Sequence, residues 1–243
     1  MEINNLSVFI SREAKTHSNR LERLKHQKEE EEKRKRYLEG FIEEIFSDAI
    51  LYRVKDVLPE IRAASAQCLC NLAEKCPDMF MNSKGVSSLS FMLFDKSSDI
   101  RELILKLLNR VLSSDQDKWL LFVQEHKDRL LEMCYDIESK CSVLAIKNAT
   151  YLARLNIFSQ EDIEKVICLL WAELPDIRKE ARDFIVKVMF SGKISETPPE
   201  DVIFKLIQLY DLYGEKKIYR VEIIVRSFWT KSTALHNLSL IHI

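Results

Sequence analysis

The length and composition of the chain indicate a helical globular protein. Its 243 residues suffice for one large domain or two small ones, and 47% of them are apolar, which excludes disorder throughout. Only 4 glycines and 5 prolines occur, and a sheet-rich fold of this size would need more of both in its turns. The formal net charge is -1, so any contact with nucleic acid must come from a local basic face.

The cysteines and the lack of long apolar runs indicate the setting of the protein. Six cysteines stand mostly among apolar residues of predicted helices, at positions 68, 70, 76, 134, 141 and 168. No secretory signal opens the sequence, so we expect free thiols in a reducing compartment. No run of 18 apolar residues occurs, so we predict no membrane span and expect no membrane among the partners.

The first predicted element is a long charged helix, or a helical hairpin, over residues 1–36. Residues 29–32 are glutamates and residues 33–36 are bases, so each acid has a base four positions later. Such pairs stabilise a solvated helix by roughly 0.2–0.5 kcal/mol each. The basic run at residues 33–36 also allows an interpretation as a nuclear import signal.

From Tyr37 onwards, apolar residues recur at helical spacing and predict a series of core-facing helices, the first at residues 38–50. The further predicted helices cover residues 61–72, 80–94, 100–112, 119–133, 143–155, 163–170, 177–190, 202–212 and 218–228. Short polar breaks separate them. At one break, Ser159 followed by Asp162 is close to a capping box, the usual signature of a helix start.

Four of these helices begin with a similar short motif that ends in arginine, at Arg62, Arg101, Arg178 and Arg220. The steps between these arginines are 39, 77 and 42 residues, and the double step leaves a missing member near Lys140. A period near 40 residues is typical of HEAT and armadillo arrays. We therefore predict an all-α solenoid of HEAT-like helix pairs over residues 37–230, preceded by the long charged helix. Each arginine is expected to reach an acid or a carbonyl of the neighbouring repeat and to fix the stacking.

Residues 231–243 are predicted to be a ragged or truncated end. The segment finishes in apolar residues, whereas a solenoid normally ends in a repeat with a polar outer face. We therefore expect the chain to be a fragment of a longer protein.

No arrangement of residues in the sequence indicates catalysis. Cys68 and Cys70 stand about 200° apart on a helix, so they cannot bind one metal ion together. No glycine-rich phosphate-binding motif is present, and His126 stands alone. We predict that the protein is not an enzyme and that it uses no metal and no cofactor.

Basic residues cluster in two parts of the sequence. One cluster contains Arg53, Lys55 and Arg62, and the other contains Lys127, Arg129, Lys140 and Lys147. The bland interpretation is a set of ordinary solvated helix ends. The alternative is a positive ridge that contacts DNA phosphates, with Arg53, Lys55, Lys127 and Arg129 as the candidate residues.

Several short sequence motifs occur in the same order as in one known protein family. They are Arg20-Leu21-Glu22-Arg23-Leu24, Arg53-Val54-Lys55-Asp56, Glu60-Ile61-Arg62-Ala63, Leu93-Phe94-Asp95, Ile100-Arg101 and Lys127-Asp128-Arg129. In this order, residues 20–192 resemble the stromalins, the HEAT-repeat subunits of cohesin. The resemblance centres on the stromalin conservative domain, at about residues 50–136.

The resemblance implies a cohesin regulatory subunit that acts in sister-chromatid cohesion, in the nucleus and on chromatin. The implied partners are the kleisin subunit, the ring ATPases of cohesin, DNA, and cohesin regulators that carry short aromatic motifs. Stromalins are several times longer, and most of their kleisin-binding face lies beyond this sequence. From the repeats alone, the alternative is a generic HEAT-repeat adaptor in transport or in a phosphatase complex.

The resemblance also implies a surface for regulator peptides at Phe91, Asp95 and His126. The family has aromatic residues at four positions of this surface, where the present sequence has Val54, Ser88, Phe91 and His126. The charged framework of the family is therefore matched better than its aromatic pocket, although Phe91 still offers a ring face to a peptide aromatic.

Overall fold

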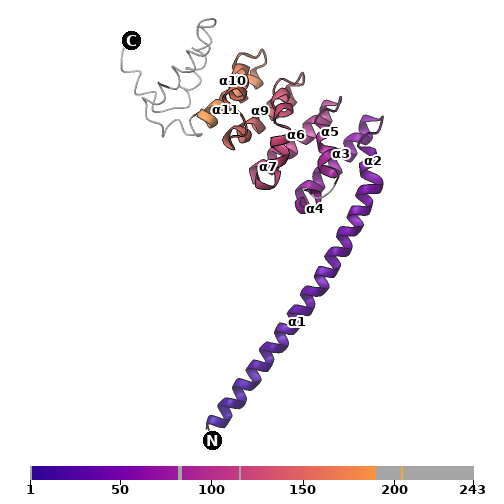
Figure 1. Ribbon diagram of the computed structural model, residues 1–243, viewed down its shortest axis with the longest axis vertical. Coiled ribbons are helices and arrows are strands. Elements are labelled where there is room, and N and C mark those ends of the chain that lie inside the picture. The colour runs from indigo at the N-terminus through magenta and orange to yellow at the C-terminus, as the bar shows by residue number, and fades with distance from the viewer. Residues whose placement is uncertain (1, 82–83, 115, 190–203, 205–243) are drawn as a thin grey trace. The chain divides into compact units, whose positions relative to one another are not determined.

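The computed structural model describes residues 2–81, 84–114, 116–189 and 204, and every regular element within them is helical (Figure 1). The chain divides into two compact units, Met1–Lys55 and Asp56–Ile243. The all-α class predicted from the sequence is confirmed. The predicted helices at residues 202–212 and 218–228, Arg220 and the end at residues 231–243 lie outside the described residues.

The first unit consists of one long helix and a short extension. Helix α1 runs from Glu2 to Ile45, a π-helical turn follows at Phe46–Ile50, and helix α2 covers Leu51–Arg53. Exposed charge pairs line α1, among them Lys28–Glu32 at 3.6 Å. Such pairs add only a few tenths of a kcal/mol each. Residues 1–36 were predicted to be a long helix or a hairpin, and α1 continues through residue 36 without a break.

The apolar stripe near the end of α1 is not the core face that the sequence predicted. Leu38 is 50% exposed, Phe41 is 52% exposed and Ile45 is 45% exposed. Within this unit the next deeply buried side chains are Phe46 and Val54. Periodicity identifies the helix and its apolar face, but burial also needs a neighbouring element. Within the described part of the first unit, the only other elements are the π-helical turn and the three-residue α2.

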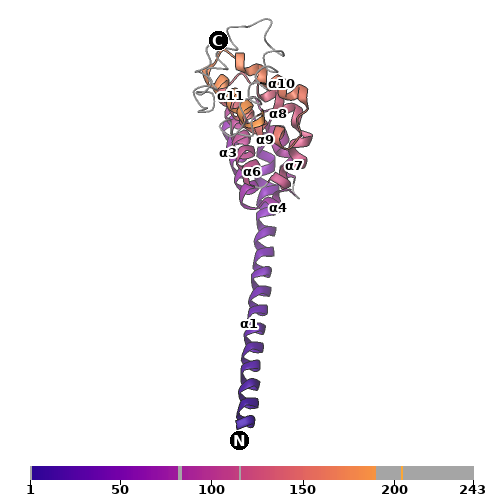
Figure 2. The same ribbon diagram turned by 90° about the vertical axis from the view of Figure 1, so that its left-hand side faces the viewer.

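The second unit is built from helices packed in two rows. Its elements are α3 Pro59–Lys75, α4 Pro77–Met81, α5 Gly85–Met92, α6 Ser98–Ser114, α7 Gln116–Glu125, α8 Lys127–Met133, α9 Ser139–Arg154, α10 Gln160–Cys168, the 3-10 turn η2 Leu169–Trp171, and α11 Pro175–Met189. Helices α3, α6, α9 and α11 contact one another in chain order (Figures 1 and 2). Helices α5, α8 and α10 form a second row against them. This is the predicted solenoid of helix pairs.

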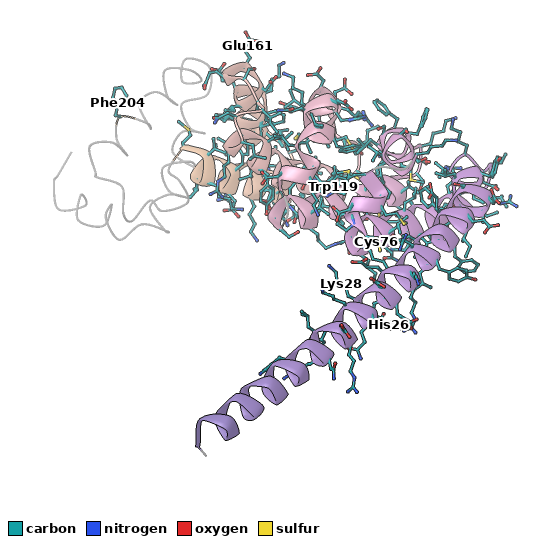
Figure 3. All side chains as sticks on the ribbon, turned by 60° about the horizontal axis from the view of Figure 1, so that its bottom comes forward. His26, Lys28, Cys76, Trp119, Glu161 and Phe204 are labelled. Atoms are coloured by element: carbon teal, nitrogen blue, oxygen red, sulfur yellow. The ribbon has the colours of Figure 1, made fainter. Side chains whose placement is uncertain are left out.

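The core of the second unit lies between the two rows. On α6, Ile100, Ile104 and Leu108 are each fully buried. Burial of one such side chain stabilises the fold by about 1.5–3 kcal/mol. Trp119 of α7 is 1% exposed and stacks on Phe80 of α4, with ring centroids 6.0 Å apart. Figure 3 shows Trp119 among the packed helices of this unit.

Local sequence signals explain where several helices begin. Pro59 and Pro175 are the first residues of α3 and α11, where the missing N–H of proline costs nothing. Helix α10 begins with the predicted capping box. The Ser159 hydroxyl accepts from the Asp162 N–H at 3.3 Å, and the Asp162 carboxylate accepts from the Ser159 N–H at 3.0 Å. These reciprocal bonds satisfy two backbone donors that a helix start otherwise leaves unpaired.

The six cysteines are free thiols, of which Cys70, Cys134 and Cys141 are buried and Cys68 and Cys168 are exposed. Within the described segments, no cluster of histidine, cysteine, aspartate or glutamate side chains has the arrangement of a metal site. None of the helices in these same segments is long and apolar enough to cross a bilayer.

Candidate functional site

Arg62 joins the first described repeat of the second unit to the next one. Its Nε and Nη2 donate to the two carboxylate oxygens of Asp95, at 2.8 and 2.9 Å. Its Nη1 donates to the backbone carbonyls of Asp56 and Val57, at 2.9 and 3.1 Å. One side chain at the start of α3 therefore fixes both the loop before its own helix and the loop after α5.

Arg101 repeats this arrangement one repeat further along. Its Nε and Nη2 donate to the carboxylate of Asp136, at 2.8 and 2.7 Å. Its Nη1 donates to the carbonyls of Asp95 and Lys96, at 2.8 and 3.2 Å. The expectation that these arginines reach an acid and carbonyls to fix the stacking therefore agrees with the geometry of Arg62 and Arg101.

The aspartates shape the loops as well as binding the arginines. Asp95 Oδ1 accepts from the Ser97 N–H at 2.8 Å, and Asp136 Oδ1 accepts from the Glu138 N–H at 3.0 Å. Asp56 accepts from the Leu58 N–H in the same way, at 3.0 Å. Each aspartate thus turns the chain into the following helix. We call the two arginine–aspartate pairs together with these loops the arginine ladder.

The arginine ladder is largely shielded from water. The side chains of Arg62 and Asp95 are 16% and 10% exposed, and those of Arg101 and Asp136 are 12% and 7% exposed. Burial raises the pKa of each aspartate and is the largest single effect. The arginine hydrogen bonds, the backbone N–H hydrogen bond and the charges of the nearby arginines together outweigh it, so the pKa is lowered. Removing one partner from such a pair costs about 3–5 kcal/mol, because the other charge stays buried and unpaired.

The ladder changes at its third position. The fourth residue of α3, α6 and α11 is an arginine, but the fourth residue of α9 is Ser142. The sequence pattern placed the missing member near Lys140, and Lys140 is an exposed residue two positions earlier. Ser142 is fully buried, and its hydroxyl donates to the carbonyl of Cys134. A hydroxyl is too short to reach the next repeat, so this position closes only its own loop.

Arg178 keeps half of the arrangement. Its Nη1 donates to the carbonyls of Ala172, at 2.8 Å, and Glu173. These carbonyls stand six and five residues before Arg178, as they do for Arg62 and Arg101. The loop-fixing role of this arginine is therefore retained at the last described helix.

Asn109 and Asn148 link α6 to α9, and the sequence interpretation missed them. The Asn109 amide donates to Asn148 Oδ1 at 3.2 Å, and the Asn148 amide donates to the carbonyl of Leu105 at 3.0 Å. Asn148 is fully buried. The two asparagines are 39 positions apart, which matches the repeat period and is the signal that would have identified them.

Some residues of the candidate peptide surface are exposed, and others already make contacts within the protein. Phe91 and Phe94 are 59% and 60% exposed, one at the end of α5 and one in the loop after it. The Asp95 carboxylate accepts hydrogen bonds from Arg62 and from the Ser97 N–H, so this residue stabilises the loop that carries the candidate peptide surface. His126 is half-buried, stacks on Phe122 with ring centroids 4.5 Å apart, and lies within 2.9 Å of the Phe122 carbonyl.

Phe94 was not among the candidate site residues, and it contacts one of the basic candidates. The Arg129 guanidinium lies 4.5 Å above the Phe94 ring. Arg129 also donates twice to the carbonyl of Leu93, at 3.2 and 2.9 Å, and pairs with Glu132 at 3.1 Å. The side chain of Arg129 is 22% exposed. These contacts hold α8 against the loop that follows α5. One face of the exposed Phe94 ring lies against the Arg129 guanidinium.

The candidate DNA-contacting residues are found in both units. Arg53 and Lys55 are exposed and belong to the first unit, whereas Lys127 and Arg129 stand on α8 of the second. Lys127 is 37% exposed and lies 3.6 Å from the Asp162 carboxylate. The geometry therefore gives Arg129 a structural task, whereas Lys127 is a partly exposed base beside one carboxylate.

The fold and the arginine ladder define an α-helical repeat protein of the HEAT type. Residues 55–126 match the family model of the stromalin conservative domain. Curated relatives extend this match over most of the chain, so the resemblance to the stromalins that the sequence motifs indicated is confirmed.

Three of these relatives show the extent of the similarity. Cohesin subunit SA-3 of Rattus norvegicus is 26% identical over 70% of this chain, and cohesin subunit SA-1 of Xenopus laevis is 25% identical over 89%. Cohesin subunit psc3 of Schizosaccharomyces pombe is 26% identical over 79%. The matched part covers 14%, 18% and 21% of these relatives, so the chain spans a small share of their length.

Proposed function

We propose that this chain is the conservative-domain part of a cohesin regulatory subunit that acts in sister-chromatid cohesion on nuclear chromatin. It acts there as a binding scaffold and not as an enzyme. The observation that carries the proposal is the match of residues 55–126 to the stromalin conservative domain. The Arg62–Asp95 pair lies inside that segment, so the matched residues include the first part of the ladder.

The kleisin subunit and the ring ATPases of cohesin are the partners proposed for the assembled protein. The names of the relatives, which are cohesin subunits in animals and yeast, support this assignment. The test is affinity purification of the tagged protein from dividing cells, followed by mass spectrometry. Recovery of a kleisin with the ring ATPases is the expected result. Recovery of transport or phosphatase components without them would instead favour the generic HEAT adaptor.

Regulators with short aromatic motifs are proposed to dock at Phe91 and Phe94. Two large, exposed rings three positions apart offer faces and edges to an incoming aromatic side chain. Truncating Phe91 to alanine is expected to weaken the binding of an aromatic peptide by roughly tenfold, as for a central interface aromatic. Leu121→Ala, at a 73% exposed apolar residue of α7, is the matched control and should leave binding unchanged.

DNA is the third proposed partner, through Lys55 and Lys127. Charge reversal at either lysine should weaken duplex binding equally for all sequences and reduce the salt slope by about 1 for each phosphate that is no longer neutralised. Lys106→Glu is the matched control, because Lys106 of α6 is 48% exposed, pairs with one carboxylate as Lys127 does, and is not among the candidate DNA-contacting residues. Salt slopes equal to that of the unchanged protein would remove both lysines from the DNA interface.

A further inference from the structure

Helix α1 carries an exposed apolar stripe with heptad spacing. Numbered as a heptad from Leu21 at position a, its a and d positions are Leu21, Leu24, Lys28, Glu31, Lys35, Leu38, Ile42 and Ile45. Leu21 is 54% exposed, Leu24 is 53% exposed, and Leu38 and Ile45 are exposed to 50% and 45%. Figure 3 shows the side chains of α1 standing out along the helix, with His26 and Lys28 labelled. Apolar a and d positions are the seam along which helices form coiled coils.

We propose that α1 pairs with α1 of a second copy of this chain, in an antiparallel two-stranded coiled coil centred at Lys33. In this register an a position faces a d position whose residue number brings the sum to 66. Leu21 of one copy then faces Ile45 of the other, and Leu24 faces Ile42. The buried centre of the seam brings Glu31 opposite Lys35. Four of the eight layers are wholly apolar, two place Lys28 opposite Leu38, and the two Glu31–Lys35 layers are complementary in charge.

The charge pattern of α1 selects the antiparallel arrangement. Residues 20–28 contain four bases and one acid, whereas residues 39–48 contain four acids and no base. A parallel pair would place each of these segments against its own copy, like charge against like charge. An antiparallel pair places the basic segment of one copy against the acidic segment of the other. The charge complementarity therefore favours a second copy of this same helix as the occupant of the stripe.

The outer flanking positions agree with this register, whereas its centre brings Glu32 opposite Glu32 at e and Arg34 opposite Arg34 at g. In antiparallel coiled coils, e positions face e positions and g positions face g positions. Lys25 and Glu39 are both at e and meet across the interface, and Arg20 and Asp48 meet at g. Because the pair is symmetric, each of these contacts occurs twice. The polar centre fixes the register at a cost in stability, so the dimer should be weak, with a dissociation constant on the order of micromolar.

The test uses charge reversal in the full chain, with sedimentation equilibrium as the readout. Lys25→Glu and Glu39→Lys are each expected to weaken the dimer by roughly five- to tenfold, because each change creates two like-charge contacts. The variant with both changes should return to within about twofold of the unchanged protein. Lys25 and Glu39 are 14 residues, or about 21 Å, apart on one helix, so a rescue reports contact between copies.

The matched control is Lys33→Glu, at the outward f position of the same helix, which should leave the dimer unchanged. Circular dichroism of every variant confirms that α1 remains helical. A protein that stays monomeric up to about millimolar concentration overturns the proposal. Tighter association of Lys25→Glu also overturns it, because Lys25 faces the Arg20 of the other copy only in a parallel pair. Capture of a different helical protein on α1, without self-association, would be a third contradicting result.

Discussion

Arg62 and Arg101 meet at a single residue, Asp95. Arg62 donates two hydrogen bonds to the Asp95 carboxylate, and Arg101 donates one to the Asp95 backbone carbonyl at 2.8 Å. The loop after α5 is thus held by one arginine from each of two neighbouring helices, α3 and α6. Neighbouring repeats share this loop, so the two arginine–aspartate pairs of the ladder, which we call its rungs, are not independent.

Loss of one rung should therefore destabilise the solenoid strongly. We expect Arg101→Ala to lower the free energy of unfolding by about 3 kcal/mol, because Asp136 then stays buried without its partner. Chemical denaturation followed by circular dichroism measures this change. Arg110→Ala is the matched control, since Arg110 pairs with Glu74 at the surface and its side chain is 52% exposed. An exposed pair contributes about 0–1 kcal/mol, so equal losses in the two variants would refute the ladder.

The sharing of the loop predicts a coupling between Arg62 and Arg101. Once Arg62→Ala has released the Asp95 carboxylate, the loop is less ordered and Arg101 binds a weaker site. The double alanine variant should lose less stability than the sum of the two single variants, with a coupling of about 0.5–3 kcal/mol. A double-mutant cycle in urea measures it. Strict additivity would show that the two rungs act separately.

Acid should weaken the ladder in a defined direction. Although burial raises it, the pKa of Asp95 and of Asp136 lies below the value of an ordinary aspartate, because hydrogen bonds from arginine and from the backbone and the arginine charges together outweigh burial. Their contribution is fully present above the unfolded pKa, near 3.9, and is lost as the pH falls through the lower folded values. Unfolding free energies should therefore stay nearly constant from pH 6 to about pH 4.5 and should fall as the pH drops below about 4. Asp136→Asn, which cannot titrate, should start lower at pH 6 and fall less steeply.

The sequence predicted those parts of this structure that depend on local signals. Pro59, Pro175 and the Ser159 capping box fixed helix starts, and the arginine motifs identified the register of the inner helices. The partners of the arginines were not identified, because Asp95 and Asp136 lie 33 and 35 positions away in loops. Their signal is the 39- and 41-residue steps from Asp56, which only become meaningful once the repeat is known.

One other prediction was wrong, because a sequence pattern carries less information than a structure. The apolar residues of α1 after Tyr37 were predicted to face a core, but periodicity does not show whether a neighbouring helix exists. The missing ladder member was predicted to lie near Lys140, and the helix start at Ser139 places Ser142, two positions further on, in that register. The peptide and DNA residues stay predictions, since exposure and charge alone do not select a partner.

Asn156 provides a test of backbone conformation at the end of α9. Its φ is 56°, the left-handed region that ends helices, and the next N–H, that of Ile157, donates to the carbonyl of Leu152 at 2.9 Å. Asn156→Gly should leave stability unchanged or slightly raised, while Asn156→Ala should cost about 1 kcal/mol. Thermal unfolding of both variants measures the difference. A valine at this position should cost more than alanine, because β-branched side chains tolerate this conformation least.

Thiol reactivity tests the packing of helices α8 and α9 without any substitution. Cys68 and Cys168 are exposed, so an alkylating reagent at about pH 7.5 should modify both first. Burial raises the pKa of Cys134 to about 12 and that of Cys141 to about 11, and only the thiolate reacts. These two thiols should react at least about a hundredfold more slowly in the native protein, and the difference should vanish in denaturant. Mass spectrometry of timed samples locates each modification. Early labelling of Cys134 under native conditions would show that α8 does not pack against α9 as the structure has it.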